Sequence, residues 1–500
     1  MTKKVLKIHD LDNVAVALID LEAGDKMALD GIEITATEHI RRGHKVAIEK
    51  IFEGANVTKY GHPIGHATSQ ILPGQWVHSH NLETNLKGTV EYEYRPVQIP
   101  ITEGYSKSAH VFQGFRRSDG KVGTRNEIWI INTVGCVNTS AKRIAEIANS
   151  KFTHKNFDGV RTFPHQFGCS QLGDDLENTQ KILSGLMKNP NAGGVLLLGL
   201  GCENNQLDSL LKVARGVDEW RLRTLVAQSV TDEVEEGLKK VGELFEILKD
   251  DIREEFPISE LVVGMKCGGS DAFSGVTANP LLGRVSDMLT AMGGKVILTE
   301  VPEMFGAEQL LMNRAKDEGV FRKIVEMINY FKGYFIEHGQ PIYENPSPGN
   351  KEGGLTTLEE KSLGAVQKGG RAIVTDVLPY GGQVNSSGLT LLAAPGNDGI
   401  SSTAMVAAGA TLLLFTTGRG TPLGFPVPTV KVSSNSYIYE KKRSWIDFDA
   451  GKLLEGEVNI DQLADEFLNF IIDVASGNRR TMNEINDYRE IAIWKEGVTL

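Results

Sequence analysis

The sequence predicts an α/β protein that begins with a small all-β module. Residues 1–92 alternate short apolar runs with turn signals, which is typical of antiparallel strands. From about residue 111, apolar runs alternate instead with helical segments. Several runs, such as residues 193–201, are apolar throughout, as expected for strands of a parallel sheet covered on both faces. We therefore predict α/β units with a parallel sheet behind the β module.

The first 92 residues contain the strand candidates of the β module. Turn signals "DG", "EGAN" and "LPGQ" separate them. The candidates are "VAVALID", "KMALDGIEITATE", "HKVAIEKI", "QWVHSH" and "TVEYEY". Residues 93–110 carry two prolines and no strong periodicity, which indicates a linker.

Strands and helices then alternate in two units that we divide near residue 255. In the first unit, 111–255, strands are predicted at 127–134, 193–201 and 223–230, with helices at 140–151, 204–216 and 232–255. In the second unit, 256–500, strands are predicted at 260–265, 295–300, 371–378, 411–418 and 428–434. So many strands, in a chain of 500 residues, favour two α/β units over one.

Composition excludes several classes of protein. The net charge of −11 argues against nucleic acid as the main partner, because a phosphate backbone requires a basic surface. No apolar run approaches the roughly 18–20 residues that span a membrane, and the N-terminus lacks the pattern of a signal peptide. We expect a cytoplasmic protein without a membrane partner. A local basic pocket for an anionic small molecule remains compatible with this charge.

The four cysteines, Cys136, Cys169, Cys202 and Cys267, are too few for a disulfide scaffold. Each neighbours a glycine and follows an apolar or partly apolar run. A structural cysteine usually lies within such a run. The settings of these four therefore favour a functional role.

Polar clusters follow most strand candidates. They are "GCVN", "GCENN", "KCGGSD", "TEVPEMFGAE", "APGND" and "TTGRGTP". In open α/β sheets, ligands bind at the carboxyl ends of the strands, so we expect many of these loops to meet in one or two crevices. Neither a dinucleotide fingerprint nor a Walker sequence is present.

These segments resemble the altronate and galactarate dehydratase family. The resemblance rests on "KCGGSDAFSGVTANPLLGR", "LTEVPEMFGAEQLLMNRA", "APGNDGISSTA", "FTTGRGTPLGFPVPTVKVSSN" and "WIDFDAG", and on the long stretch from "PIYENPSPGN" to "GAVQKGG". "RRGHKVAIEKI" and "WVHSHNLETNL" resemble the family's N-terminal β-clip module, the SAF domain. "GFRRSDGKVGTRNEIWIINTVGCVN" is similar to the start of its second domain, and "KIHDLDNVAVAL" favours the altronate branch.

The resemblance implies an activity, a cofactor and a domain plan. Family members dehydrate sugar acids, and the altronate branch converts D-altronate to 2-dehydro-3-deoxy-D-gluconate during hexuronate catabolism. It implies a hydro-lyase that uses Fe2+ and forms a homodimer. It also implies a SAF-like β-clip domain over 1–92, a linker over 93–110, a dimerising middle domain over 111–255 and a Rossmann-like catalytic domain over 256–500.

The predicted reaction requires a base and a cationic centre. A base must lie within about 3 Å of the C2 proton, and a metal ion or ammonium group must stabilise the enolate that forms. In "KCGGSD", Cys267 and Asp271 offer anions to a metal, and Asp271 is also a candidate catalytic group. Lys266 is a base if it is desolvated and a carboxylate clamp if it is not. The alternative is a structural turn with a buried thiol.

Two metal arrangements fit the sequence. One is a single Fe2+, or another divalent cation such as Mn2+, held by carboxylates, imidazoles and one thiolate. The other is an iron–sulfur cluster held by three of the four cysteines. Because no C-x-x-C spacing occurs, distant loops would have to assemble such a cluster.

For each of the other candidates, a purely structural role is the alternative to a functional one. Glu300, with Glu303 beside it, is predicted to be a ligand, an acid–base group or a helix cap. His165 is predicted to be a base, a ligand or a hydrogen-bonded core histidine. We expect Arg419 to bind the substrate carboxylate. Asn204, Glu203 and Asn397 are further substrate-binding or helix-capping candidates, as is Asp398 beside Asn397.

The β module adds its own candidates. His78 and His80 alternate, so we expect them on one face of a strand, which suits contact with a metal or substrate. Lys59 adds positive charge for an anionic acid, and the alternative for all three is a solvated face. His62 and His66 are expected on a loop. Whether the module closes over the site of its own chain or of a neighbour stays open.

Two other functions remain. One is a galactarate dehydratase, or a lyase that acts on another 2-hydroxy acid. The other is a protein that binds sugar acids without catalysis.

Overall fold

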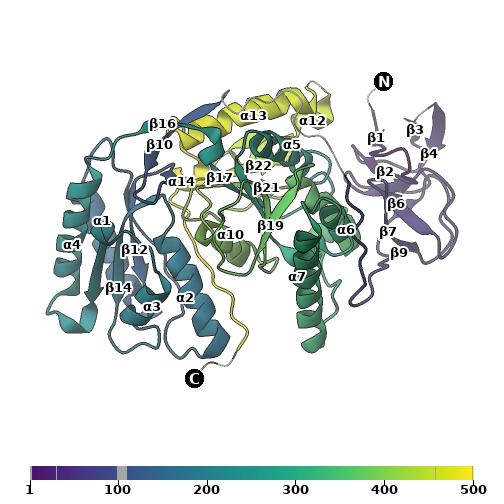
Figure 1. Ribbon diagram of the computed structural model, residues 1–500. Coiled ribbons are helices and arrows are strands. Elements are labelled where there is room, and N and C mark those ends of the chain that lie inside the picture. The colour runs from purple at the N-terminus through teal and green to yellow at the C-terminus, as the bar shows by residue number, and fades with distance from the viewer. Residues whose placement is uncertain (1–2, 30, 98–109, 457, 498, 500) are drawn as a thin grey trace.

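The computed structural model of the chain describes residues 3–29, 31–97, 110–456, 458–497 and 499. It confirms the predicted fold class. Figure 1 shows the strand-rich N-terminal module at one end, the middle domain at the other and the C-terminal domain between them. Residues 98–109, most of the linker predicted over 93–110, lie outside the described residues.

The N-terminal module consists of short antiparallel strands. Its sheets have the orders β1-β2-β5-β8, β3-β4 and β6-β7-β9. The strands are β1 (Val5–Leu6), β2 (Val14–Ala17), β3 (Lys26–Leu29), β4 (Ile32–Thr35), β5 (Lys45–Ala47), β6 (Asn56–Lys59), β7 (His62–Ala67), β8 (Trp76–Val77) and β9 (Leu82–Glu83).

Three local predictions for this module are wrong. His62 and His66 lie on strand β7 rather than on a loop, because β6 turns back at Gly61 and Asn56 pairs with His66. His78 and His80 do not share a strand, since β8 ends at Val77 and the Asn81 side chain accepts a hydrogen bond from His78 N. The run "TVEYEY" at residues 89–94 forms no strand.

The middle domain is a parallel sheet between two layers of helices. The sheet order is β13-β12-β14-β15, and a second, antiparallel sheet has the order β11-β10-β16. The strands are β10 (Val111–Arg116), β11 (Val122–Gly123), β12 (Glu127–Asn132), β13 (Gly159–Thr162), β14 (Ala192–Gly199), β15 (Leu222–Val226) and β16 (Glu254–Pro257). The helices are α1 (Asn138–Lys151), α2 (Gly173–Met187), α3 (Leu207–Val213) and α4 (Glu233–Leu248).

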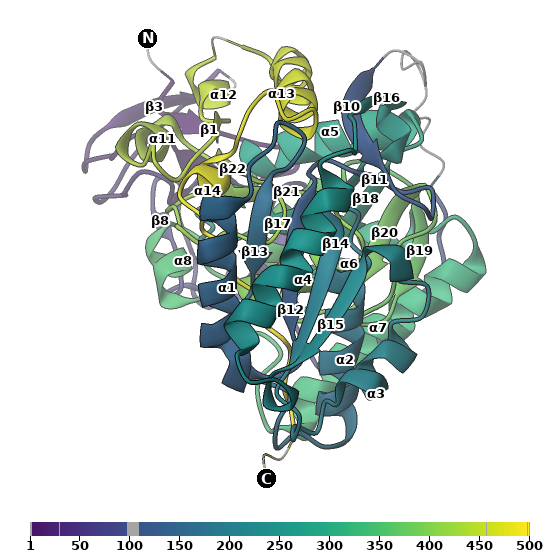
Figure 2. The ribbon, with the colours of Figure 1, turned by 90° about the vertical axis from the view of Figure 1, so that its left-hand side faces the viewer.

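Both faces of the middle sheet are buried, as its continuous apolar strands predicted. Figure 2 looks onto the face covered by α1 and α4, while α2 and α3 pack on the other face. Alternate residues of β12 enter the two cores: Ile128 and Ile130 face α1 and α4, and Trp129 and Ile131 face α2. The helix predicted over 232–255 is shorter than expected, because residues 254–257 leave it to pair with β10.

The C-terminal domain has a seven-stranded parallel sheet with the order β19-β20-β18-β17-β21-β22-β23. Its strands are β17 (Val262–Cys267), β18 (Lys295–Leu298), β19 (Val374–Leu378), β20 (Gly388–Leu392), β21 (Leu412–Thr417), β22 (Thr429–Ser433) and β23 (Phe448–Asp449). Its helices are α5 (Ala278–Ala291), α6 (Glu308–Met312), α7 (Glu318–Glu337), α8 (Pro348–Glu352), α9 (Leu358–Ala365), α10 (Asp398–Ala407), α11 (Ser436–Lys441), α12 (Lys452–Glu455), α13 (Ile460–Ala475) and α14 (Met482–Ile485).

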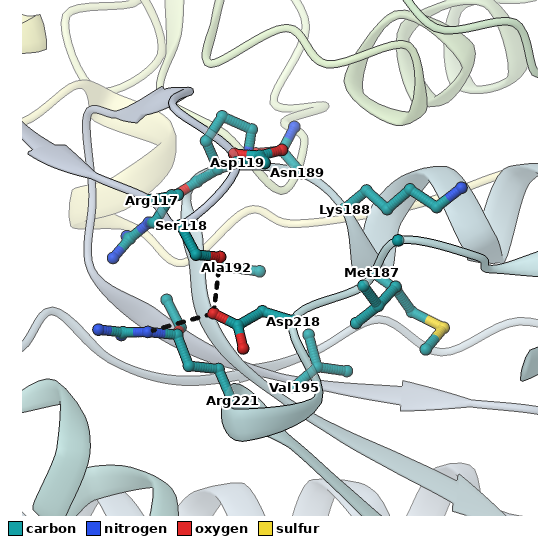
Figure 3. Close-up of a pocket in the computed structure, with 14 residues that line it drawn as sticks. Arg117, Ser118, Asp119, Met187, Lys188, Asn189, Ala192, Val195, Asp218 and Arg221 are labelled. Carbon is teal, nitrogen blue, oxygen red and sulfur yellow. Dashed lines mark hydrogen bonds and ion pairs between the residues drawn. The ribbon is translucent and has the colours of Figure 1, made fainter.

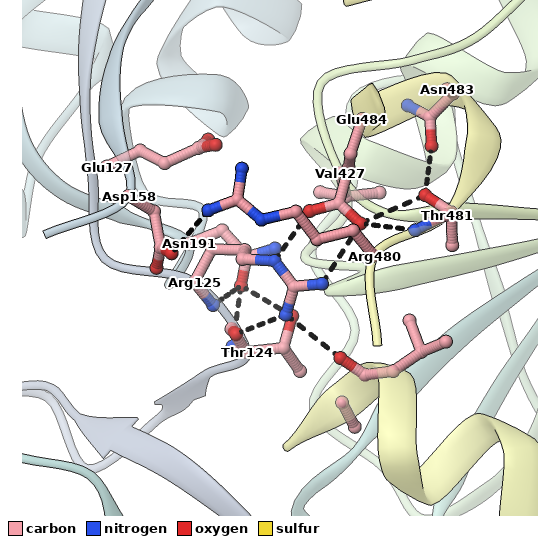
Figure 4. Close-up of polar contacts among 12 residues, drawn as sticks. Thr124, Arg125, Glu127, Asp158, Asn191, Val427, Arg480, Thr481, Asn483 and Glu484 are labelled. Atoms are coloured by element: carbon pink, nitrogen blue, oxygen red, sulfur yellow. Dashed lines mark hydrogen bonds and ion pairs between the residues drawn. The ribbon is translucent and has the colours of Figure 1, made fainter. Parts of the chain in front are cut away.

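A buried ion pair joins the middle and C-terminal domains (Figure 4). Arg125 donates to both carboxylate oxygens of Glu484, at 2.6 and 3.0 Å. Burial opposes the charge of Glu484, but Arg125 outweighs burial and lowers the pKa of this carboxyl to about 2. Glu484 Oε2 also accepts from Thr481 N and Oγ1 at the start of α14. The pair is therefore fully hydrogen-bonded, as a buried charge requires.

A second buried network joins the N-terminal module to α9. Glu360 accepts a hydrogen bond from Lys45 Nζ at 2.9 Å and from Lys59 Nζ at 2.8 Å. All three side chains are at most 1% exposed. Burial raises the pKa of Glu360, but the two ammonium groups outweigh it and hold this pKa far below the usual value. One carboxylate thus pairs with two lysines, which come from two different sheets of the module.

We expect the Glu360→Gln variant to destabilise the protein by about 3–5 kcal/mol, because it leaves two buried ammonium groups without a counter-charge. Urea unfolding at pH 7 measures this loss. In the control, Lys45→Met, the pair of Glu360 with Lys59 survives and Gly354 O loses its donor, so about 1–2 kcal/mol should be lost. Equal losses in the two variants would contradict the proposed role of the carboxylate.

Candidate active site

The carboxyl ends of four neighbouring strands form the candidate active site. Lys266 lies in β17, Glu300 follows β18, Asp398 follows β20 and Arg419 follows β21. Because β20, β18, β17 and β21 are adjacent in the parallel sheet, these residues meet at one edge. The sequence predicted this gathering from the polar clusters after each strand.

Lys266 is the centre of a buried charge network. Its ammonium group contacts the carboxylates of Glu300 and Asp398, the latter at 2.9 Å. Lys266 is fully buried, whereas the Asp398 side chain is 35% exposed. Burial opposes the charge of Lys266, but Glu300, Asp398 and Glu303 outweigh it and hold the pKa of this lysine above its usual range. These ion pairs favour the ammonium form of Lys266, and with it the carboxylate-clamp alternative over a lysine base.

Glu300 has an unusual backbone conformation. Its φ of 66° and ψ of 50° lie in the left-handed region, which residues other than glycine rarely adopt. The side chain is buried between two lysines, with Lys368 Nζ at 2.9 Å from Oε2. Backbone strain of this kind collects at functional sites, where the surrounding structure holds it in place.

Glu303 has a free oxygen within this network. Its Oε1 lies 2.9 Å from Lys361 Nζ and 3.4 Å from Asn345 Nδ2. Its Oε2 is buried and has no hydrogen-bond partner within the described part of the chain. Burial raises the pKa of Glu303, but Lys361, Lys266 and Lys368 outweigh burial and lower it. Glu303 is thus an ionised carboxylate with one unoccupied acceptor.

The "KCGGSD" turn lies beside this network, but its side chains are engaged with each other. Cys267 Sγ lies 2.7 Å from Ser270 Oγ. Asp271 Oδ1 accepts from Ser274 and Ser434, and Oδ2 accepts from Asn435. Burial raises the pKa of Asp271. A Cβ at Gly268 would lie 2.5 Å from Asp398 Oδ2, so glycine lets this turn approach the network. The geometry fits the structural-turn alternative better than a metal site at Cys267 and Asp271.

Helix α8 connects the turn, the sheet edge and the N-terminal module. Asn350 Nδ2 donates to Ser270 O at 2.8 Å, and Arg419 donates to Gly349 O at 3.0 Å. Arg419 also forms an ion pair with Glu352 at 3.1 Å and stays half-exposed. From the module side, His78 Nε2 lies 3.0 Å from Lys351 O.

His44 also contacts the end of α8, because its Nε2 lies 3.1 Å from Glu352 O. The ring of His44 stacks on that of His78. His80 is exposed and packs against Trp76 instead. Lys59 is 1% exposed and bound to Glu360, and the predicted contact with substrate would require this pair to open. Asn397 caps α10 and is exposed next to Asp398.

The remaining candidates lie at the carboxyl edge of the middle sheet, away from the C-terminal sheet. Cys136, Cys169 and Cys202 follow β12, β13 and β14. Glu203 and Asn204 adjoin Cys202, and Asn204 Oδ1 accepts from Ser170 N. Glu203 accepts from Thr133 Oγ1 and from the N–H groups of Leu200 and Gly201, and these bonds outweigh burial and lower its pKa.

His165 belongs to this second group and has backbone partners at both ring nitrogens. Nε2 lies 2.9 Å from Asn132 O, and Nδ1 accepts from Phe167 N. Burial lowers the pKa of His165. These contacts match the core-histidine alternative, and a role as a base would require them to break.

The sequence did not single out several residues of the charge network. Lys361 and Lys368 follow Glu360 on and just after α9, and Asn345 and Asn350 flank the start of α8. The available signal was "LEEKSLGA" (358–365), which carries three charged residues in a segment that the structure buries completely. In the described residues, no three histidine, cysteine, aspartate or glutamate side chains are grouped closely enough to hold a metal ion.

Two cavities lie elsewhere. The one in Figure 3 is at the amino end of the middle sheet, between Arg117, Lys188, Asp218 and Arg221. It holds about 50 Å³, too little for a six-carbon acid. A cavity of about 580 Å³ lies between α2 and α7, with Tyr330 and Trp494 in its wall. Neither is lined by a residue of the Lys266 network.

The chain matches three family descriptions along its length. Residues 3–85 match "Altronate/galactarate dehydratase SAF domain", and residues 114–249 match "D-galactarate dehydratase/Altronate hydrolase, second domain". Residues 258–499 match "D-galactarate/Altronate dehydratase, C-terminal".

Curated proteins similar to the chain share nearly its full length. An altronate dehydratase of Bacillus subtilis (strain 168) is 52% identical and covers 100% of both chains. An altronate dehydratase of Escherichia coli (strain K12) is 50% identical over 99% of both chains. A galactarate dehydratase (L-threo-forming) of the same E. coli strain is 36% identical over 96% of this chain and 94% of its own.

We expect acid to loosen the docking of the N-terminal module through His78. Burial and the nearby Lys45 lower the pKa of His78 to about 4. Between about pH 6.5 and pH 4 the unfolded chain therefore binds a proton that the folded chain excludes, so the unfolding free energy falls as the pH falls. Because His78 is partly exposed, the expected loss is about 1–2 kcal/mol.

Urea unfolding of wild type and His78→Gln across this pH range measures the effect. The variant should show a flatter pH profile, and His62→Gln, at an exposed position on β7, should match wild type. If His78→Gln and wild type keep parallel profiles, His78 does not carry this proton.

Proposed function

The chain belongs to the D-galactarate/altronate dehydratase family, and we propose that it removes water from D-altronate to give 2-dehydro-3-deoxy-D-gluconate. This membership confirms the resemblance seen in the sequence. The observation that carries the substrate assignment is the identity of 52% and 50% to two altronate dehydratases, against 36% to a galactarate dehydratase.

The Lys266 network suits the charge that this reaction develops. Loss of the C2 proton next to a carboxylate creates an enolate with two negative charges, which fixed cations stabilise. Lys266, Lys361 and Lys368 are balanced by Glu300, Glu303 and Asp398 in the resting site. We assign Lys266 the role of a protonated donor to the developing charge or to the departing 3-hydroxyl.

Glu303 is the base that the contacts favour. It is ionised, and its Oε2 is an acceptor without a partner among the described residues. The carboxylates of Glu300 and Asp398 both contact Lys266. His165, the other base candidate from the sequence, lies at the middle sheet with both nitrogens engaged. A carboxylate with one free oxygen can take the C2 proton without first giving up a hydrogen bond there.

Arg419 is the proposed anchor for the substrate carboxylate. Its guanidinium lies at the open end of the site, half-exposed, and binds Glu352 and Gly349 O. A planar guanidinium binds a carboxylate through two parallel hydrogen bonds. Of the other predicted substrate-binding residues, Asn397 caps α10 beside Asp398, and His78 contacts Lys351 O on the helix that also binds Arg419.

Iron remains part of the proposal, as the family resemblance implies. When bound, iron supplies a Lewis acid that helps a hydroxyl leave. The donor set at Cys267 and Asp271 does not fit it, because both side chains already have hydrogen-bond partners. The carboxylates of the Lys266 network have lysine partners, so a divalent ion would compete with ammonium groups there. We therefore derive no step through iron at this edge.

The assembly and the compartment are also proposals. We propose a homodimer, as the resemblance implies for the middle domain, which exposes 73% of Trp220. We propose a cytoplasmic location because the four cysteines are unpaired thiols, which suit a reducing compartment. Within the described residues, no helix has the length and apolar character needed to cross the lipid bilayer.

Turnover under anaerobic conditions with added Fe2+ tests the substrate. We expect D-altronate to yield a 2-keto-3-deoxy acid, with a kcat/KM at least about tenfold above that for galactarate, since one altered contact with a substrate hydroxyl costs 1.4 kcal/mol or more. Faster turnover of galactarate would assign the chain to that substrate. If the protein bound D-altronate but formed no product, the remaining function would be sugar-acid binding without catalysis.

The Glu303→Gln variant tests the base. It keeps the size of the side chain and removes its capacity to accept a proton, so kcat should fall by about 10²–10⁴-fold with little change in KM. Glu326→Gln, an exposed position on α7, serves as the matched control and should retain wild-type kcat. Unchanged kcat in a folded Glu303→Gln protein would show that another residue is the base.

A further inference from the structure

Three of the four cysteines lie on one rim of the middle domain. Cys136, Cys169 and Cys202 come after β12, β13 and β14, which are adjacent in the sheet order β13-β12-β14. The strands are parallel, so their carboxyl ends lie at the same edge. Cys267 lies in the other sheet, in β17. The structure thus divides the four cysteines into three and one.

Hydrogen bonds tie the three cysteine loops to one another. Gly135 N, before Cys136, donates to Phe167 O in the Cys169 loop at 3.0 Å. Asn205 N, in the Cys202 loop, donates to Gly168 O at 2.9 Å. Asn205 Nδ2 also donates to Thr133 O at 2.9 Å, next to the end of β12. Each loop therefore contacts both of the others, and the three thiols are carried on one connected rim.

The exposure of these thiols needs an explanation. A free cysteine behaves as a small apolar residue and is usually buried. Cys267 follows this rule, whereas Cys136, Cys169 and Cys202 are all exposed. Exposed free thiols are a liability to oxidation unless they have a ligand. Three on one rim, each directly after a glycine, form a pattern that core packing does not account for.

Their spacing favours a ligand larger than a single ion. Neighbouring strands lie about 5 Å apart, so β13 and β14, on either side of β12, are about 10 Å apart. A single zinc ion, with bonds of about 2.3 Å, gathers its ligands around one point, whereas these cysteines stand on three separate loops. In the described residues, no three histidine, cysteine, aspartate or glutamate side chains are grouped as a site for a single ion requires. An iron–sulfur cluster, with its ligands on different iron atoms, spans more widely spaced loops.

We propose that Cys136, Cys169 and Cys202 hold a four-iron, four-sulfide cluster on this rim. Each thiol loses its proton when its sulfur binds an iron atom, and no electron is transferred in that ligand exchange. Three protein ligands leave the fourth iron open to an oxygen ligand such as a hydroxyl or carboxylate. The cluster site does not depend on the substrate, whereas its use in dehydration rests on the proposed function.

The surroundings of the rim suit an anionic cluster. Helix α1 begins two residues after Cys136 and α2 begins four residues after Cys169, so two positive helix ends point to this edge. A Cβ at Gly168 would lie 2.1 Å from Thr133 O, so only glycine brings the Cys169 loop this close to β12. Gln171, two residues after Cys169, is buried, and its Nε2 has no partner within the part of the chain described. That N–H is a donor available to a sulfide or thiolate.

Ligand exchange with a synthetic four-iron thiolate cluster, added anaerobically to the full chain, tests this site. Three protein thiols replace three external thiolates, which leave as thiols, so charge and electrons balance. We expect wild type to retain about four iron and about four sulfide per chain, with the visible absorbance of such a cluster. Cys136→Ser, Cys169→Ser and Cys202→Ser should each lose most of it, because two thiols are too few.

Cys267→Ser is the matched control and should bind as much cluster as wild type. Circular dichroism of each variant checks the fold, which the three substitutions at exposed sites should leave unchanged. Absence of the cluster from folded wild type, or its loss in Cys267→Ser but not in the three rim variants, would overturn the assignment. Turnover of D-altronate by cluster-free protein would leave the proposed function standing while removing the cluster from it.

Discussion

Burial of charge on one short helix, α9, is the constraint on which the arrangement of this protein depends. Glu360 faces the N-terminal module and pairs with both Lys45 and Lys59, while Lys361, the next residue, faces the sheet edge and pairs with Glu303. Every residue of α9 is buried, so none of these charges can turn to water. The helix therefore fixes the module and the candidate active site at the same time. A change that displaces α9 for one purpose disturbs the other.

The structure separates two kinds of chemistry that the sequence placed together. The C-terminal sheet edge collects ammonium and carboxylate groups, which hold and move protons. The middle sheet edge collects thiols and amides around Cys136, Cys169 and Cys202, which suit a soft metal centre. Each rim follows the same rule that loops after parallel strands carry function, and the difference lies only in the residue types that those loops contain.

The sequence predicted the layers of the fold well, because buried parallel strands form continuous apolar runs. Runs such as residues 193–201 and 411–418 became β14 and β21 with small errors at their ends. Strands of the module were harder to predict from the sequence. The sequence of β7 contains two histidines and a proline, which are typical of a loop, and only its pairing with β6 shows that it is a strand. Local sequence does not contain that pairing.

Individual site residues were less predictable for a related reason. The loop motifs identified the sheet edge, but the state of Lys266 depends on Glu300 and Asp398, which are 34 and 132 residues away in the chain. Lys59 was expected at the surface, yet α9 covers it. The predicted division near residue 255 separated Cys267 from the other three cysteines, but only the strand order shows that the loops of those three follow adjacent strands.

The pairing of β10 with β16 has a consequence for how the protein is put together. Val111 lies opposite Pro257, and Ile258 N donates to His110 O at 3.1 Å, so the chain enters and leaves the middle domain at a single point. A segment whose two ends touch can be treated as a cassette: excising residues 111–257 would leave two backbone ends close enough to be rejoined by a short linker. The two paired strands also give such a cassette an axis for rotation, and contacts across the domain boundary, such as the Arg125–Glu484 pair and the bridge between Gln171 and Thr499, hold it in place.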